Sequence, residues 1–128
     1  MITRDENLLK IRPELNINSE NSTELEQFQN NTLRPVLKLQ NQVFINLFKE
    51  HLFATKRQIS IYNTKVQKTL IRESIAKNHN LRNSFVHAVI GMLTNDEFNF
   101  YVQHKKEITK RINSMVQKRI QDQLELLY

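Results

Sequence analysis

Histidines and carboxylates are the side chains of this sequence that could coordinate a metal ion or carry acid–base chemistry. His79 and His87 lie eight residues apart, and they would share a face only within one unbroken helix. The segment 78–80, Asn-His-Asn, predicts an interruption there, because asparagine favours turns. Neither H-E-x-x-H nor E-x-x-H occurs, although these are the spacings by which helices present ligands to zinc or to paired iron ions. We therefore predict no metal site and no cofactor.

Catalytic carboxylate pairs and nucleophile motifs are not visible either. Glu97 is explained as part of a helix cap, and Glu107, Asp122 and Glu125 fall on polar faces of a predicted helix. There is no cysteine, and the single glycine, Gly91, excludes the glycine-rich loops that cradle phosphates. A Ser-His-Asp triad assembled in space stays open, because its members need not be close in sequence. These observations lean against an enzyme without excluding one.

A basic helix–turn–helix pattern covers residues 72–90. Two short helices would meet at a turn that contains Asn80, with Leu81, Val86 and Val89 facing the core. In one interpretation the motif binds DNA, with the second helix contacting base edges and nearby cations contacting phosphates. The side chains that it would present are Arg72, Arg82, Asn83, Ser84 and His87. The other interpretation, which we favour because the motif is degenerate, is an ordinary corner within a helical bundle.

Basic residues also follow the last predicted helix. Arg111 and Arg119 lie eight residues apart with Met115 midway, so all three can lie near one helix face. An arginine beside a packing stripe needs a partner, such as an acidic group on another helix or on a second subunit. We therefore treat these three residues as a possible interface, with a solvated basic face as the alternative. Three aromatic residues that are poorly explained as core are further interface candidates, namely Phe53, Phe100 and Tyr128.

The spacing of apolar residues predicts the helices that would position these groups. Phe44 and Phe48 in one segment, and Ile112 and Val116 in the last, recur at four residues. Thr-x-x-Glu capping boxes begin at residues 23 and 94, and Pro35 suits the first turn of a helix. The predicted helices cover residues 23–30, 34–54, 64–78, 81–90, 94 to about 103, and about 107 to 128, with a further turn at 6–10. We expect an all-α, single-domain bundle of five to six helices with an N-terminal arm.

Gly91 is predicted to end the helix that begins near Leu81. Helices commonly end at a glycine in the left-handed conformation, which a residue without Cβ adopts freely. The chain would then turn into the capping box at Thr94. On this interpretation Gly91→Ala would cost about 1 kcal/mol or more.

Charge divides the chain into two parts. Residues 1–31 hold three basic and six acidic residues, a net charge of −3, whereas residues 32–128 hold sixteen basic and seven acidic residues, a net charge of +9. We accordingly divide the chain into an acidic arm, residues 1–21, and a helical domain, residues 22–128. The arm either folds back and screens the basic body or moves away to expose it to an anionic partner. Ile11, Leu15 and Ile17 could dock the arm on the body.

The sequence also indicates where the protein resides. Acidic residues stand where a secretory signal peptide would be apolar, and no apolar run of about 18 residues exists. The absence of cysteine excludes disulfides. We expect a cytoplasmic protein that does not bind membranes.

The segments 28–35, 85–91 and 94–101, followed by Arg111 and Arg119, resemble a group of short, uncharacterised bacterial all-helical proteins. The likeness extends over most of residues 5–125. Members of that group sometimes carry a glyoxalase label. The glyoxalase fold consists of βαβββ units with histidine and glutamate metal ligands on strands, whereas this sequence predicts hardly any strand. The label therefore finds no support in these residues.

The leading functional hypothesis is a protein-interaction or self-associating module without catalytic activity, in which the acidic arm and the last helix take part. It predicts a dimer or larger species in solution. The alternative is a helix-turn-helix DNA-binding protein that uses residues 72–90, and it predicts binding to duplex DNA that weakens steeply with salt.

Overall fold

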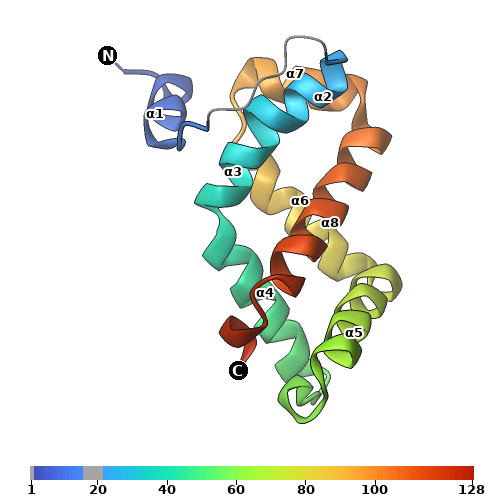
Figure 1. Cartoon of the computed structure of the whole chain (residues 1–128). Coiled ribbons are helices and arrows are strands. Elements are labelled where there is room, and N and C mark those ends of the chain that lie inside the picture. The colour runs from blue at the N-terminus through green and yellow to red at the C-terminus, as the bar shows by residue number, and fades with distance from the viewer. Residues whose placement is uncertain (1, 16–21) are drawn as a thin grey trace.

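The computed structural model describes residues 2–15 and 22–128, and within these ranges every regular element is helical (Figure 1). The all-α prediction is confirmed, but the described residues form more helices than the five or six predicted. The α-helices are α1 (Arg4–Ile11), α2 (Glu24–Phe28), α3 (Arg34–Leu39), α4 (Asn41–Ala54), α5 (Thr64–Lys77), α6 (His79–Ile90), α7 (Asn95–Gln103) and α8 (Lys105–Gln121). Short 3₁₀ turns lie at Ile59–Ile61 and Leu124–Leu127. Within the described ranges, no helix is long and apolar enough to cross a membrane.

The core lies where α4, α5, α6 and α8 pack together, with α8 contacting each of the other three. Phe44 of α4 and Phe85 of α6 are fully buried and meet edge to face, with their ring centroids 5.9 Å apart. Ile112 and Val116 of α8 are also buried, as their spacing predicts. Burying one side chain of this size contributes about 1.5–3 kcal/mol to stability. The predicted apolar stripes thus hold the bundle together.

The chain around Pro35 differs from the prediction. Instead of two separate helices, α2 continues through a π-helical turn, Gln29–Leu33, into α3. The amide of Arg34 donates to the carbonyl oxygen of Gln29, five residues back. A proline lacks the amide hydrogen and its ring clashes with the carbonyl four residues earlier in an α-helix, so a wider turn before Pro35 accommodates it. The predicted helix 34–54 is divided instead at Gln40, between α3 and α4.

Asparagine and threonine caps fix the starts of the later helices. Thr94 and Glu97 form the predicted capping box at the start of α7, and Asn63 caps α5. The turn expected at Asn80 lies two residues earlier, at Asn78. Asn78 is the cap of α6, and its side-chain oxygen accepts from the amide of Leu81 at 2.8 Å. Helix α6 therefore starts at His79, and Asn80 lies in its first turn.

Gly91 does not have the conformation predicted for it. It has φ −60° and ψ −15°, which any residue adopts. Among the residues that the structure describes, positive φ occurs at Lys56, at 56°, just after α4. The amide of Arg57 donates to Leu52 O and that of Lys56 to Phe53 O, which is the pattern of a helix end that usually contains glycine. The left-handed helix end thus lies at the end of α4 rather than of α6.

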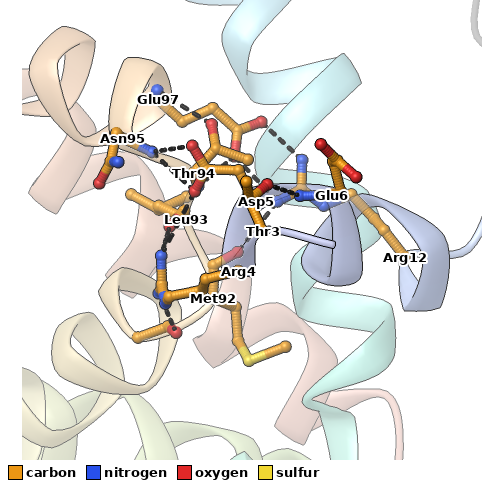
Figure 2. Close-up of polar contacts among 11 residues, drawn as sticks. Thr3, Arg4, Asp5, Glu6, Arg12, Met92, Leu93, Thr94, Asn95 and Glu97 are labelled. Carbon is orange, nitrogen blue, oxygen red and sulfur yellow. Dashed lines mark hydrogen bonds and ion pairs between the residues drawn. The ribbon is translucent and has the colours of Figure 1, made fainter. Parts of the chain in front are cut away.

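The N-terminal arm forms a longer helix than the single turn predicted at 6–10. Helix α1 is capped by Thr3 and stands beside the bundle, to which it is bound through the segment 91–97 (Figures 1 and 2). The guanidinium of Arg4 donates to Gly91 O at 2.9 Å and to Leu93 O at 3.0 Å. Ile11 is exposed, so polar contacts rather than this side chain attach the helix. The segment 16–21 of the arm, which includes Ile17, lies outside the described residues.

The C-terminal helix also ends earlier than predicted. Helix α8 stops at Gln121, and the chain then forms the 3₁₀ turn in which Leu127 is buried. This turn contacts α4, so the C-terminus lies beside that helix (Figure 1).

Candidate interaction surfaces

The corner at residues 72–90 consists of α5 and α6, joined directly at Asn78. Leu81, Val86 and Val89 are buried as expected. Of the residues predicted to face outward, Arg72 and His87 are exposed. The other three are half-buried, namely Arg82, Asn83 and Ser84.

Contacts within the corner occupy those three half-buried side chains. Arg82 Nη1 donates to the carbonyl oxygens of Ile75, at 2.8 Å, and Ala76, at 2.6 Å. The cation therefore satisfies carbonyl groups at the end of α5, where the helix dipole also favours positive charge. Asn83 Nδ2 lies 3.1 Å from His79 Nε2, and Ser84 Oγ donates to the backbone of the same helix. DNA binding stays a prediction, with Arg72 and His87 as its free contact groups.

Two arginines of α8 make hydrogen bonds with other elements: Arg111 with the π-helical turn and Arg119 with α4. Arg111 Nη1 donates to Gln29 Oε1 at 2.7 Å, and Arg119 Nη1 donates to Asn41 Oδ1 at 3.2 Å. We expected acidic partners, yet in the part of the chain that is described both partners are side-chain amides. Met115, between them, is half-buried against the core. These three residues therefore make contacts within the chain, and their role in an interface stays a prediction.

A groove of about 440 Å³ lies between α3 and the second half of α8. We call it the arginine groove, and it is lined by Arg34, Met115, Lys118, Arg119, Asp122 and Gln123. Burial and the charge of Arg34 lower the pKa of Arg119. Lys118 and Asp122 pair with each other at 3.5 Å. The contribution of Arg34 was not predicted, because Arg34 reaches this groove only through tertiary packing: it begins α3, directly after the π-helical turn that contacts α8.

Large apolar side chains are exposed at the opposite end of the bundle from α7. We call this surface the apolar end and define it by Phe53, Ile61, Tyr62 and Tyr128. Phe53 is 83% exposed, Ile61 68% and Tyr128 63%. Phe53 and Tyr128, two of the three aromatic interface candidates, are thus exposed. The third, Phe100, instead packs on the ring of Phe28, with the centroids 4.8 Å apart.

Two hollows join the residues of the apolar end. The first, of about 370 Å³, is lined by Phe48, Leu52, Lys56, Arg57, Gln58, Ile59, Ile61, Tyr62, Leu70 and Ser74. The second is lined by Phe53 and Tyr128 and shares the segment 57–59 with the first. Tyr128 is held by a hydrogen bond of 2.8 Å from its hydroxyl to Gln67 Oε1. Residues 56–62 line one or both of these hollows, and they belong to the loop that forms the lower end of the molecule in Figure 1.

The apolar end is also basic. Residues 49–68 include five basic residues and one acidic residue, a net charge of +4. Lys49, Lys56 and Arg57 are exposed around the two hollows. Burial, together with the charge of Arg57, lowers the pKa of the adjacent His51. A surface that combines exposed apolar area with positive charge suits an apolar partner that carries negative charge.

Within the residues that the structure describes, no group of three histidine or acidic side chains is placed to hold a metal ion. Comparisons of the chain with family models, curated proteins and solved structures find no match. The resemblance to short bacterial helical proteins therefore stays a prediction. The function is therefore inferred from the surfaces of this chain.

Proposed function

We propose that the chain is a protein-interaction module that acts by binding rather than by catalysis, and that the apolar end is its binding surface. The observation that carries this proposal is the exposure of Phe53 beside Tyr128 and the hollow floored by Leu52 and Ile59. Contiguous apolar surface of this kind on a soluble protein marks an interaction site. Two further properties suit Phe53 to binding: it is aromatic, and it lines a hollow.

The partner is an acidic segment of another protein that also carries apolar residues. Lys49, Lys56 and Arg57 surround the hollows, so an approaching acidic group gains favourable electrostatic energy. Two copies of this chain that met face to face through their apolar ends would instead bring these cations together. Charge complementarity therefore favours a different protein over a second copy.

Site-specific photocrosslinking in cells tests this proposal. A photoreactive phenylalanine analogue replaces Phe53 in one variant and Val102 in a matched control. Val102 is also exposed, but it lies on α7, at the other end of the bundle. We expect a protein adduct from position 53 that is absent from position 102, and a crosslinked peptide rich in acidic and apolar residues. The purified partner should bind the full chain about tenfold or more weakly after Phe53→Ser, because a buried phenylalanine contributes about 1.5–3 kcal/mol.

The outcomes separate the alternatives. Binding that is weakened by Arg57→Glu supports the acidic partner. Equal adduct formation at both positions overturns the proposal. Adducts only between two copies, together with a dimer in light scattering that Phe53→Ser abolishes, overturn the acidic partner and establish self-association through the same surface.

A further inference from the structure

The arginine groove holds positive charge that the described part of the chain does not neutralise. Arg34 and Arg119 line the same hollow of about 440 Å³, and among the described residues neither lies within ion-pairing distance of a carboxylate on another helix. Asp122 is the acidic residue of the groove, and it pairs with Lys118. The groove therefore presents a net charge of about two positive units, contributed by its two arginines.

Each of these two guanidinium groups is held by one neutral contact and has donors to spare. Arg34 Nε donates to Asn30 Oδ1 at 3.0 Å, which leaves both of its terminal amino groups without a partner in the described residues. Arg119 uses Nη1 for Asn41 Oδ1. A guanidinium carries five N–H donors in a planar fork, so most donors of the pair remain available to a ligand in the groove.

Amide side chains fix Arg119 in position. Asn41 Nδ2 donates to Gln123 Oε1 at 2.8 Å, and Gln123 Nε2 donates back to Asn41 Oδ1 at 2.9 Å. Gln123 Nε2 also lies 2.9 Å from the carbonyl oxygen of Arg119, where it can donate. The oxygen that accepts from Arg119 is thus itself held by Gln123, which lies in the turn that follows α8. A preorganised donor costs less to order when a ligand binds.

Burial makes an anion favourable at this place. Arg119 is half-buried, and burial together with the charge of Arg34 lowers its pKa. Both causes disfavour the charged form of the guanidinium. An anion between the two arginines would offset both, since it attracts each cation and replaces lost hydration with charge-assisted hydrogen bonds.

We propose that the arginine groove is a binding site for a phosphate dianion, either inorganic phosphate or a small phosphate ester. One carboxylate matches one guanidinium fork, whereas a tetrahedral dianion offers oxygens to two forks and balances both charges. This site is separate from the apolar end, so the two proposals succeed or fail independently.

Calorimetric titration of the full chain at constant ionic strength tests the site. Inorganic phosphate and glycerol phosphate are the two probes, and succinate is the carboxylate comparison. We expect saturable binding of one phosphate per chain and about a tenfold or greater loss of affinity in Arg34→Gln and in Arg119→Gln. Arg72→Gln removes the same charge from an exposed position on α5, and it should leave the affinity unchanged.

Further comparisons guard against misfolding and general charge effects. Arg34→Gln leaves the contacts of α8 with Asn41 intact, so its loss of affinity cannot arise from disruption of that network. Asp122→Asn removes a repelling charge and should tighten binding. Affinity should also rise between pH 5 and pH 7, because the second pKa of a phosphate ester is about 6 and the arginines stay cationic.

The titrations test whether the site binds phosphate and whether its ligand is the free ion or an ester. Tighter binding of glycerol phosphate indicates esters, and tighter binding of inorganic phosphate indicates the free ion. Equal weakening in all three arginine variants, succinate binding as tightly as phosphate, or an absence of saturation would each overturn the proposal.

Discussion

Arg12 and Glu97, 85 residues apart in sequence, form a two-point ion pair between the N-terminal arm and α7 (Figure 2). Arg12 Nη2 donates to Glu97 Oε1 at 2.8 Å and Nη1 donates to Oε2, and the Arg12 side chain is only 8% exposed. Glu97 Oε1 also accepts from the amide of Thr94, and Oε2 accepts from the hydroxyl of Thr32. One carboxylate therefore joins the arm, the start of α7 and the π-helical turn.

The stability of the chain should fall in acid through Glu97. Burial alone would raise the pKa of Glu97, but hydrogen bonds from Arg12, Thr94 and Thr32 and the charge of Arg12 outweigh it and hold this pKa below its ordinary value of 4.5. The stabilisation is therefore complete above about pH 4.5 and is lost as the pH falls through the lower folded-state pKa. Glu97→Gln should lower the free energy of unfolding by about 2–3 kcal/mol at pH 7 and flatten its decrease in acid. Urea unfolding at several pH values measures both, with the exposed Glu50→Gln as control.

Arg12 and Glu97 should also be energetically coupled. Removal of either partner leaves the other poorly compensated, so Arg12→Ala and Glu97→Ala should each destabilise the chain, and the double change should cost clearly less than their sum. The expected coupling energy is about 1–3 kcal/mol. Hydrogen exchange should show α1 opening in Arg12→Ala, because Arg12 also holds Met92 O at 2.9 Å. Strict additivity would mean that the arm and the bundle fold independently of this pair.

Gly91→Ala should stabilise the protein, contrary to the expectation from sequence. With φ −60° at this position, an added Cβ meets only His87 O, at an ordinary 3.5 Å. Alanine reduces the conformational freedom of the unfolded chain, so the free energy of unfolding should rise by about 0.4–1 kcal/mol. Thermal and urea unfolding measure it. A loss of stability would show that Gly91 adopts positive φ in solution.

Lys56→Gly should stabilise the protein for the opposite reason. Lys56 has φ 56°, where a side chain is disfavoured by about 1–2 kcal/mol, and glycine relieves this cost at a small entropic penalty. We expect a gain of about 0.5–1 kcal/mol in urea unfolding. Lys56→Ala removes the same charge but keeps Cβ, so it should leave stability unchanged. Equal gains in both variants would assign the effect to charge rather than to the backbone.

These two positions show which parts of the fold can be predicted from local sequence. The stripes that contain Phe44 and Ile112, and the capping box at Thr94, depend on residues within one or two turns, and they are confirmed. Glycine at a helix end is a statistical preference, and here the left-handed conformation lies at Lys56 instead. Nothing near Lys56 in the sequence identifies it as left-handed. That conformation is set by the way in which α4 ends and leads into the loop 55–62.

The surfaces were less predictable than the core. The aromatic residues Phe53 and Tyr128 could be recognised as unexplained by helical stripes, but their grouping with Ile61 depends on tertiary packing. The same holds for the approach of Arg34 to Arg119, which come from elements far apart in sequence. Arg12 carries no local pattern that identifies Glu97 as its partner. Contacts of this range follow from the arrangement of the helices and not from any single helix.

Arg82 should prove to be a structural residue. Its guanidinium satisfies the carbonyl oxygens of Ile75 and Ala76, so Arg82→Gln should lower the free energy of unfolding by about 1–2 kcal/mol, whereas Arg72→Gln should change it by less than about 0.5 kcal/mol. Urea unfolding of the two variants measures this difference.

A loss of DNA binding in an Arg82 variant would then be confounded by loss of structure. DNA binding is better tested by Arg72→Gln and His87→Gln, which remove exposed groups. If these two abolished salt-sensitive binding to duplex DNA while Arg82→Gln left stability unchanged, the corner would be a DNA reader and not a packing element.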